Sequence, residues 1–331
     1  MERVEKLSSH LSTAAPTMAA TASTLASPSP SNAMFPLCDG VEIPAVGFGC
    51  VGAKESMAEA LAVGFVHLDT AAIYKGGQSE KDVGELLREH AGEPIFVTTK
   101  VASYGPAANT YMWDPFVDAQ QGVQTEFAQC LERLGASTVD LLLLHWPGPP
   151  RDGRPDRPNV LTAAQHEKKR LAMWRGLEAI HANGGARAIG VSNFSIAHLT
   201  ALLPHCGQRP CCNQIELHSQ CGQRELVAYC QEQNILPVAY SPISGSDLSA
   251  APLPALAATY DVSPAAVVAR WLFQRGVVVI TQSKTPARIA NNRTMADGWA
   301  LTEPDMLAIT NACMDEAPGG HTSAHAWANI L

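Results

Sequence analysis

The sequence predicts an α/β protein in which eight parallel strands close into a (β/α)8 TIM barrel, with a short N-terminal β-hairpin closing the bottom. Short apolar, β-rich runs recur eight times after residue 44, and segments with helical spacing of apolar residues lie between them. Strands that are apolar throughout are typical of a parallel sheet covered by helices. The chain has 331 residues, which is enough for one barrel of this kind.

The individual elements can be assigned along the chain. A hairpin is expected in FPLCDGVEIP, where Asp39-Gly40 favours a tight turn. The barrel strands are expected at residues 45–49, 65–69, 95–100, 141–145, 188–192, 212–216, 236–240 and 277–280. Helical spacing is found at residues 54–64, 79–90, 116–135, 163–184, 196–205, 223–234 and 263–276. The alternative, an open doubly wound sheet, needs a GxGxxG turn at the first strand, and VGFGCVGA has its glycines in another order.

The N-terminal segment differs in composition from the rest of the chain. Residues 7–33 are rich in Ser, Ala, Thr and Pro and contain no acidic residue, so residues 1–33 are expected to be a disordered leader before a catalytic barrel at 34–331. The composition is typical of a transit peptide, although Met18 and Met34 could also be the true starts. We expect a cytoplasmic protein, or a plastid or mitochondrial one if the leader is a transit peptide.

Charge and cysteine content exclude several classes of partner. The net charge of −8 argues against nucleic acid or an anionic membrane surface as a partner. The nine cysteines are scattered, and those at positions 211, 212, 221 and 230 match no common zinc-ligand spacing. We therefore expect no metal, no membrane span and a monomer that acts on a small molecule.

Polar residues follow nearly every predicted strand at its carboxyl end, where barrel enzymes place their chemistry. They are Asp69 with Tyr74 behind it, Lys100, His145, Ser192-Asn193, Gln214 with Glu216, and Tyr240-Ser241. A lysine ammonium close to a tyrosine is expected to lower the pKa of the phenol, and an aspartate keeps that lysine charged. With a histidine to hold a carbonyl oxygen, such a set suits proton delivery while hydride attacks the carbon, and the hydride must come from a cofactor.

Seven motifs in order resemble those of the aldo-keto reductase family over nearly all of residues 35–315. They are GFVHLDTAAIY (64–74), VTTK (97–100), DLLLLHWP (140–147), RAIGVSNF (187–194), NQIELH (213–218), VAYSPI (238–243) and ITQSKTPARIANN (280–292). The resemblance implies reduction of aldehydes or ketones to alcohols with NADPH, NADH being the alternative. It implies a catalytic set of Asp69, Tyr74, Lys100 and His145, with Tyr74 as the proton donor.

The resemblance also implies which residues hold the cofactor. Ser192, Asn193 and Gln214 would bind the nicotinamide carboxamide, and Tyr240 would stack on the ring. The remaining cofactor residues would be Gly49, Cys50, Ser241, Ile243, Ser244, Gln282, Ser283, Lys284, Arg288, Asn291 and Asn292. Three depart from the common pattern: Gln282 stands where many members have lysine, Asn291 where a carboxylate or glutamine often lies, and Cys50 where threonine is common. Loss of the lysine removes a charge-assisted contact to the 2′-phosphate, for which Arg288 and Lys284 could compensate.

The substrate side is less specific. Tyr74, His145, Trp113 and Trp146 are the expected substrate-binding residues, and aromatic residues of the loop 102–116 and the tail after residue 315 favour an apolar carbonyl compound. An alternative function is that of a regulatory subunit that binds nucleotide and senses redox state with little turnover. A metal-dependent barrel hydrolase is a further alternative, but it would need several ligands at the strand ends, and only His145 is there.

Overall fold

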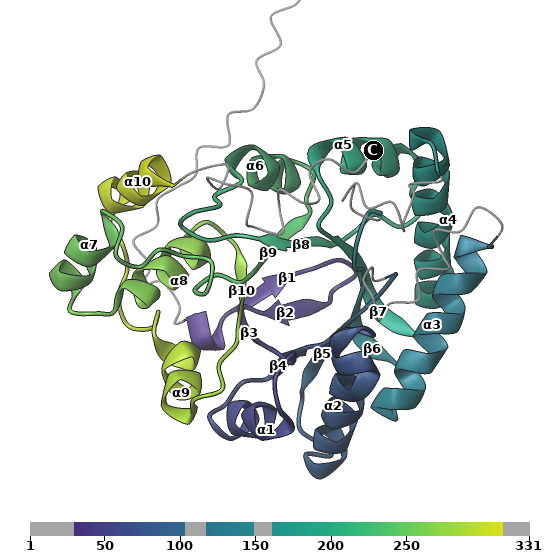
Figure 1. The fold of residues 1–331 in the computed structure, drawn as a ribbon, viewed down its shortest axis with the longest axis horizontal. Helices are drawn as coiled ribbons and strands as arrows, with labels where there is room; N and C mark the ends of the chain where they lie inside the picture. Colours follow the sequence, from purple (N-terminus) through teal and green to yellow (C-terminus); the bar gives the residue numbers. More distant parts are fainter. Residues whose placement is uncertain (1–29, 103–116, 149–160, 314–331) are drawn as a thin grey trace, which may run out of the picture.

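The computed structural model describes residues 30–102, 117–148 and 161–313. Within these ranges eight parallel strands form a closed ring with helices around it (Figure 1). The order around the ring is β10-β3-β4-β5-β6-β7-β8-β9, so each strand pairs with the next along the chain and the last pairs with the first. The predicted barrel is confirmed, and the open-sheet alternative is wrong.

All eight barrel strands overlap the runs expected from the sequence. They are β3 (Val46–Gly49), β4 (His67–Asp69), β5 (Phe96–Val101), β6 (Val139–Leu144), β7 (Ala186–Ser192), β8 (Cys212–Glu216), β9 (Leu236–Tyr240) and β10 (Val278–Thr281). The leucines of β6 show why these runs are apolar on both faces. Leu141 and Leu143 pack in one cluster with Ile43 of the hairpin, whereas Leu142 and Leu144 pack in a second cluster that includes residues of the surrounding helices. Alternate residues thus face the barrel interior and the helices, and both sides exclude water.

Helices connect the strands. They are α1 (Lys54–Ala62), α2 (Gln78–Glu89), α3 (Ala119–Leu134), α4 (Ala163–Ala182), α5 (Ile196–Leu202), α6 (Arg224–Glu232), α7 (Leu253–Tyr260), α8 (Pro264–Gln274), α9 (Pro286–Thr294) and α10 (Glu303–Ala312). Three short 3-10 turns are η1 (Pro30–Asn32), η2 (Tyr74–Gly77) and η4 (Leu203–His205). The helices α7, α9 and α10 were not among those expected. Each of α9 and α10 buries a single residue, Ile289 or Ile309, so no apolar period repeats along it. The sequence of α7, LPALAATY, is apolar along nearly its whole length, so it shows no contrast between two faces.

The expected N-terminal hairpin is present. Strands β1 (Met34–Pro36) and β2 (Glu42–Pro44) pair antiparallel, and the φ angles of Asp39 and Gly40 are 55° and 73°, which suits a tight hairpin turn. Val41 and Ile43 pack against inward-facing barrel residues such as Phe96 and Leu141, and Figure 1 draws the hairpin across the middle of the ring. The hairpin therefore covers the barrel interior.

The folded part begins before the boundary expected at residue 34. Pro30–Asn32 form η1, and the Ser31 backbone N–H donates to Asp297 Oδ1 at 3.0 Å. The Ala33 carbonyl accepts a hydrogen bond from the Ala45 N–H at 2.9 Å. Residues 30–33 are thus packed on the barrel, and residues 1–29 lie outside the described residues.

Candidate active site

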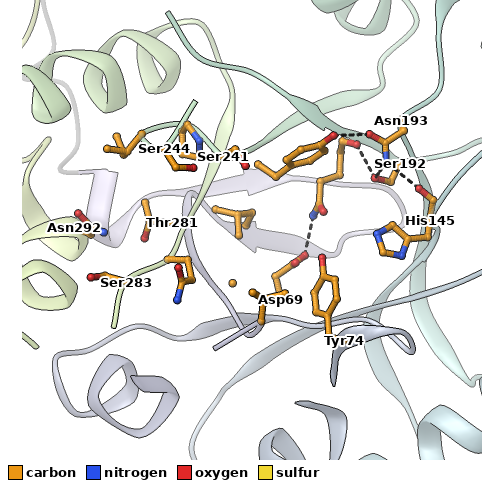
Figure 2. Close-up of a pocket in the computed structure, with 18 of the residues that line it drawn as sticks. Asp69, Tyr74, His145, Ser192, Asn193, Ser241, Ser244, Thr281, Ser283 and Asn292 are labelled. Carbon is orange, nitrogen blue, oxygen red and sulfur yellow. Dashed lines mark hydrogen bonds between the residues drawn. The ribbon is translucent and has the colours of Figure 1, made fainter. Parts of the chain in front are cut away.

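A cavity of about 620 Å³ lies at the carboxyl ends of the barrel strands (Figure 2). Ligand pockets commonly measure about 300–1,000 Å³, so this one can hold a small molecule and part of a larger one. It is lined by Gly49, Val51, Asp69, Ile73, Tyr74, His145, Trp146, Ser192, Asn193, Gln214, Tyr240, Ser241, Pro242, Ile243, Ser244, Ile280, Thr281, Gln282, Ser283, Arg288 and Asn292. The polar strand-end residues singled out in the sequence therefore meet at one site, apart from Lys100, which lies behind it, and Glu216.

Lys100 and Asp69 form an ion pair beneath the cavity. Lys100 Nζ donates to Asp69 Oδ1 at 2.5 Å and to the Thr70 carbonyl at 2.9 Å. The Lys100 side chain is fully buried, and that of Asp69 is nearly so. Burial alone would lower the pKa of Lys100, but Asp69 and Tyr74 raise it above its ordinary value. The buried ammonium therefore keeps its charge.

Tyr74 lies next to this ammonium. It follows β4 and begins η2, where Lys75, Gly76 and Gly77 all have positive φ and the chain turns directly into α2. Lys100 Nζ lies 5.2 Å from the centre of the Tyr74 ring, and the phenol hydroxyl points into the cavity (Figure 2). The structure therefore places the Lys100 ammonium and its partner Asp69 beside the Tyr74 phenol, as expected.

The net direction of the Tyr74 pKa differs from the expectation. Burial raises the pKa of Tyr74 above 10, and the opposing effect of the Lys100 ammonium does not outweigh it. The expectation considered only the ammonium, whereas the cost of a buried phenolate depends on how much water the fold removes. The phenol is consequently protonated at neutral pH.

His145 completes this end of the cavity. Its backbone N–H donates to the Val101 carbonyl at 2.8 Å, which continues the β5–β6 pairing. Its ring meets Tyr74 edge-on, with ring centres 5.9 Å apart, and stacks on Trp146 at 5.5 Å. Burial, together with the Lys100 ammonium, holds the pKa of His145 well below 6.5, so the imidazole is neutral.

A hydrogen-bonded group occupies the wall opposite Tyr74. The Tyr240 hydroxyl donates to Asn193 Oδ1 at 2.8 Å, and Asn193 Nδ2 donates to the His145 carbonyl at 3.0 Å. Ser192 Oγ donates to the Gln214 carbonyl at 2.8 Å. Gln214 Nε2 donates to Asp69 Oδ2 at 2.7 Å, which the sequence did not suggest. Asp69 thus accepts from Lys100 on one oxygen and from Gln214 on the other.

The other end of the cavity is formed by the loops after β9 and β10. Ser241, Ile243, Ser244, Gln282, Ser283, Arg288 and Asn292, all expected cofactor residues, line it together with Gly49 of β3. Figure 2 shows Ser241, Ser244, Ser283 and Asn292 on the side away from Tyr74 and His145. Gln282 lies beside Gly52, where an added Cβ would come within 3.1 Å of Gln282 Nε2.

Three expected cofactor residues are not in the lining. Cys50 is fully buried, and its thiol donates to the Phe48 carbonyl at 3.5 Å, so its side chain is turned away from the cavity. Lys284 and Asn291 are exposed, and neither contributes to the lining. The turn after β3 directs Cys50 into the core, and α9 presents Arg288 and Asn292 to the cavity in place of Asn291.

The substrate side is only partly described. Trp146 lines the cavity as expected, whereas Trp113, the loop 103–116 and the tail 314–331 lie outside the described residues. The sequence reasoning missed Val51, Ile73, Pro242, Ile280 and Thr281. Thr281 ends β10, and the strand-end rule could have found it; the four apolar residues carry no signal that separates them from core residues.

The donors around the cavity fit an elongated anionic nucleotide. Arg288 is exposed and is the one lining residue with a permanently charged cationic side chain among those described. Serine hydroxyls and the Asn292 amide line the same cavity, and Arg guanidinium groups bind phosphate well. The cavity continues from this end to Tyr74 and His145. The residues present therefore fit a cofactor that carries phosphate groups, as a nicotinamide dinucleotide does.

The residues that the structure describes contain neither a metal-binding cluster nor a helix able to span a membrane. Residues 30–102, 117–148 and 161–313 contain no group of three or more His, Cys, Asp or Glu side chains arranged to hold a metal ion. None of the helices in those ranges has the length and apolar character needed to cross a membrane.

Two known proteins with similar sequences are named as reductases. A 9,11-endoperoxide prostaglandin H2 reductase of Trypanosoma cruzi is 34% identical over 299 residues, which cover 86% of this chain and 93% of that protein. A glyoxal reductase of Bacillus subtilis is 35% identical over 295 residues, covering 86% of this chain and 94% of the relative.

Solved structures agree with this likeness. An aldo/keto reductase of Brucella melitensis superposes with a TM-score of 0.70 at 31% identity, covering 85% of this chain and 99% of that one. A Bombyx mori aldo-keto reductase, solved in complex with NADP, gives a TM-score of 0.70 at 29% identity, covering 86% and 94%. The model of the aldo/keto reductase family matches residues 51–312. With its closed barrel and the strand-end site described above, this chain belongs to the aldo-keto reductase family.

Proposed function

We propose that this protein is an NADPH-dependent reductase that converts aldehydes or ketones to alcohols, with Tyr74 as the general acid. The observation that carries the proposal is the buried Lys100–Asp69 ion pair beneath a phenol that opens into the cavity. A bound reduced nicotinamide would supply the hydride for the carbonyl carbon. Relatives that are named as glyoxal and methylglyoxal reductases support the choice of carbonyl substrates.

Each of the four catalytic side chains has a distinct task in this proposal. The neutral His145 donates an N–H hydrogen bond to the carbonyl oxygen and orients it. As negative charge develops on that oxygen, Tyr74 transfers its phenolic proton to it, and the alcohol forms. Lys100, fixed by Asp69, stabilises the phenolate that remains until a proton from solvent restores the phenol. The raised pKa of Tyr74 keeps the proton on the phenol until the oxyanion forms.

The cavity lining supports both the cofactor and the substrate class. Arg288 would bind the 2′-phosphate that distinguishes NADPH from NADH, while Ser241 and Ser244 would contact the pyrophosphate. Val51, Ile73 and Trp146 surround the end that holds Tyr74, and none of them carries a charge. We infer that these residues favour an uncharged carbonyl compound, because among the described residues lining this end an ionic group would lose its hydration without gaining a cation as partner.

Removal of one hydroxyl tests the mechanism. General acid catalysis contributes about 10²–10⁴-fold, so Tyr74→Phe should lower the rate of aldehyde reduction by at least about 100-fold. NADPH binding, measured by quenching of tryptophan fluorescence, should change little. Tyr229→Phe is the matched control, since it also removes a phenol hydroxyl, one that hydrogen-bonds Thr200 at 3.0 Å outside the cavity.

Two results would contradict the proposal. Wild-type reduction rates in Tyr74→Phe would remove the phenol from the mechanism. Tight nucleotide binding by the wild-type protein, without reduction across a panel of aldehydes and ketones, would favour the redox-sensing regulatory subunit.

A further inference from the structure

We propose that the buried imidazole of His218 sets the position of the loop 241–246, and that Gly245 lets this loop approach close enough to hold the nucleotide. The inference rests on the proposed function, because it assigns a role in cofactor binding. Neither residue lines the cavity, so both are positioning residues that act through Ser241 to Ser244.

The first step is that His218 has a fixed position. It follows β8, it is fully buried, and its backbone forms an antiparallel bridge with Cys221. His218 Nδ1 accepts a hydrogen bond from the Gln220 N–H at 3.1 Å. Since Nδ1 is the acceptor, Nε2 carries the proton and donates to Glu216 Oε1 at 3.2 Å. Both ring nitrogens are therefore engaged, and the ring cannot turn without breaking one of these bonds.

The second step is that the loop rests directly on this ring. A Cβ added at Gly245 would lie 2.2 Å from His218 Cδ2 and 2.3 Å from Nε2. The backbone φ of Gly245 is not in the left-handed region, so the conformation itself would accept an L residue. Contact with His218 is the obstacle to a side chain at this position.

The third step links the contact to the cavity. The Gly245 N–H donates to the Ser241 carbonyl at 3.1 Å, and the Ser246 N–H donates to the Ile243 carbonyl at 3.1 Å. Ser246 Oγ donates to the Pro242 carbonyl at 3.0 Å and accepts from the Ser219 N–H at 3.2 Å. The loop is thus a compact turn tied next to His218, and displacement of Gly245 displaces the turn as a unit.

The fourth step identifies which ligand would be affected. Ser241, Pro242, Ile243 and Ser244 line the cavity, and Figure 2 shows Ser241 and Ser244 on the side away from Tyr74 and His145. A shift of this loop therefore changes the part of the cavity proposed for the phosphates and leaves the proton-transfer end in place. His218 and Gly245 should affect nucleotide affinity without affecting the chemical step.

A double-mutant cycle tests this inference. Gly245→Ala should move the loop away from the ring and from the nucleotide, and the loss of about one hydrogen bond to a charged phosphate should raise the NADPH dissociation constant by about tenfold. The single-turnover rate of reduction at saturating NADPH should stay near the wild-type rate. Because His218→Ala removes the ring that the new methyl group would meet, adding Gly245→Ala to it should have little further effect on the dissociation constant.

Two further measurements make the test specific. Gly207→Ala is the matched control, since a Cβ there meets only the Glu178 carboxyl group, with Oε1 at an ordinary 3.5 Å, and NADPH binding should not change. Hydrogen exchange of residues 241–252, measured without nucleotide, should become faster in Gly245→Ala, because the loop has left the ring.

The outcomes separate the two proposals. Wild-type nucleotide affinity in Gly245→Ala, or an equal loss in the His218→Ala background, would overturn the role of the His218 contact. A wild-type protein that binds neither NADPH nor NADH would contradict the proposed function instead. In that case the exchange measurement still decides whether His218 anchors the loop, and unchanged exchange in Gly245→Ala would refute the anchor.

Discussion

The buried carboxyl group of Glu126 should make the stability of this barrel depend on pH near neutrality. Glu126 lies on α3, and its Oε2 accepts a hydrogen bond at 2.8 Å from the N–H of Ala102, just after β5. Burial raises the pKa of Glu126 from 4.5 to about 7, and the negative charge of Glu80 also raises it. The hydrogen bond from the Ala102 N–H and the positive charge of Arg133 lower this pKa, but by less. Arg133 and Glu80 themselves form an ion pair at 2.6 Å, so the cation nearby is already engaged.

The size of the effect follows from the two pKa values. Between pH 4.5 and 7 the folded protein binds more protons at Glu126 than the unfolded chain does, so stability falls as the pH rises through this window. At about 1.4 kcal/mol per pH unit, the loss amounts to about 3 kcal/mol, and it levels off above pH 7. Glu126→Gln keeps an oxygen for the Ala102 N–H but cannot ionise. The free energy of unfolding of the variant, relative to wild type, should therefore increase by about 2–3 kcal/mol between pH 5 and pH 8.5.

Urea unfolding at pH 5 and pH 8.5, followed by circular dichroism, measures the free energy of unfolding of Glu126→Gln relative to wild type. Glu132→Gln, an equivalent change at an exposed position of the same helix, is the control and should show no such pH dependence. Any constant cost of the amide cancels, because only the change with pH is compared. If Glu126→Gln and wild type keep the same stability difference at both pH values, the burial argument is refuted.

Two other perturbations follow from the structure. His67, fully buried in β4, has its pKa lowered from 6.5 to about 4, chiefly by burial, so the unfolded chain binds the extra proton. This group therefore contributes a loss of about 3 kcal/mol as the pH falls from 6.5 to 4, and His67→Leu lacks it, so the free energy of unfolding of wild type relative to His67→Leu should fall by about that amount in urea unfolding; a stability difference that does not change with pH would contradict it. Arg288→Ala should weaken NADPH binding by about tenfold or more, the value of a charged hydrogen bond, and leave NADH within about twofold. Equal weakening of both nucleotides in a fluorescence titration would show that Arg288 does not contact the 2′-phosphate.

Local features of the sequence predicted the barrel and most of the site. All eight strands appear as short apolar runs, since each is buried on both faces, and the connecting helices carry their own period. Asp69, Tyr74, His145, Ser192 and Gln214 could be singled out because the ends of parallel barrel strands meet at one rim. The helices α7, α9 and α10 escaped prediction because their sequences carry no repeating apolar face. The cytoplasmic location, the monomeric state and the role of residues 1–29 stay predictions.

The direction in which each side chain points, and its contacts with residues distant in sequence, could be known only from the folded structure. Cys50 adjoins the cavity in sequence yet turns its thiol into the core, and Gln214 reaches Asp69 across 145 positions. The Tyr74 phenol is near the expected ammonium, but its pKa rises because burial outweighs that charge.

The order of residue types along the chain was sufficient to determine a closed parallel barrel and the set of groups at its rim, because periodicity and strand ends are local properties. Only the tertiary structure decided how much water each group loses and which groups separated in sequence come into contact, such as Gly245 with His218 and Glu126 with Ala102. Desolvation and close packing depend on all the neighbours of an atom, and these neighbours come from distant parts of the chain.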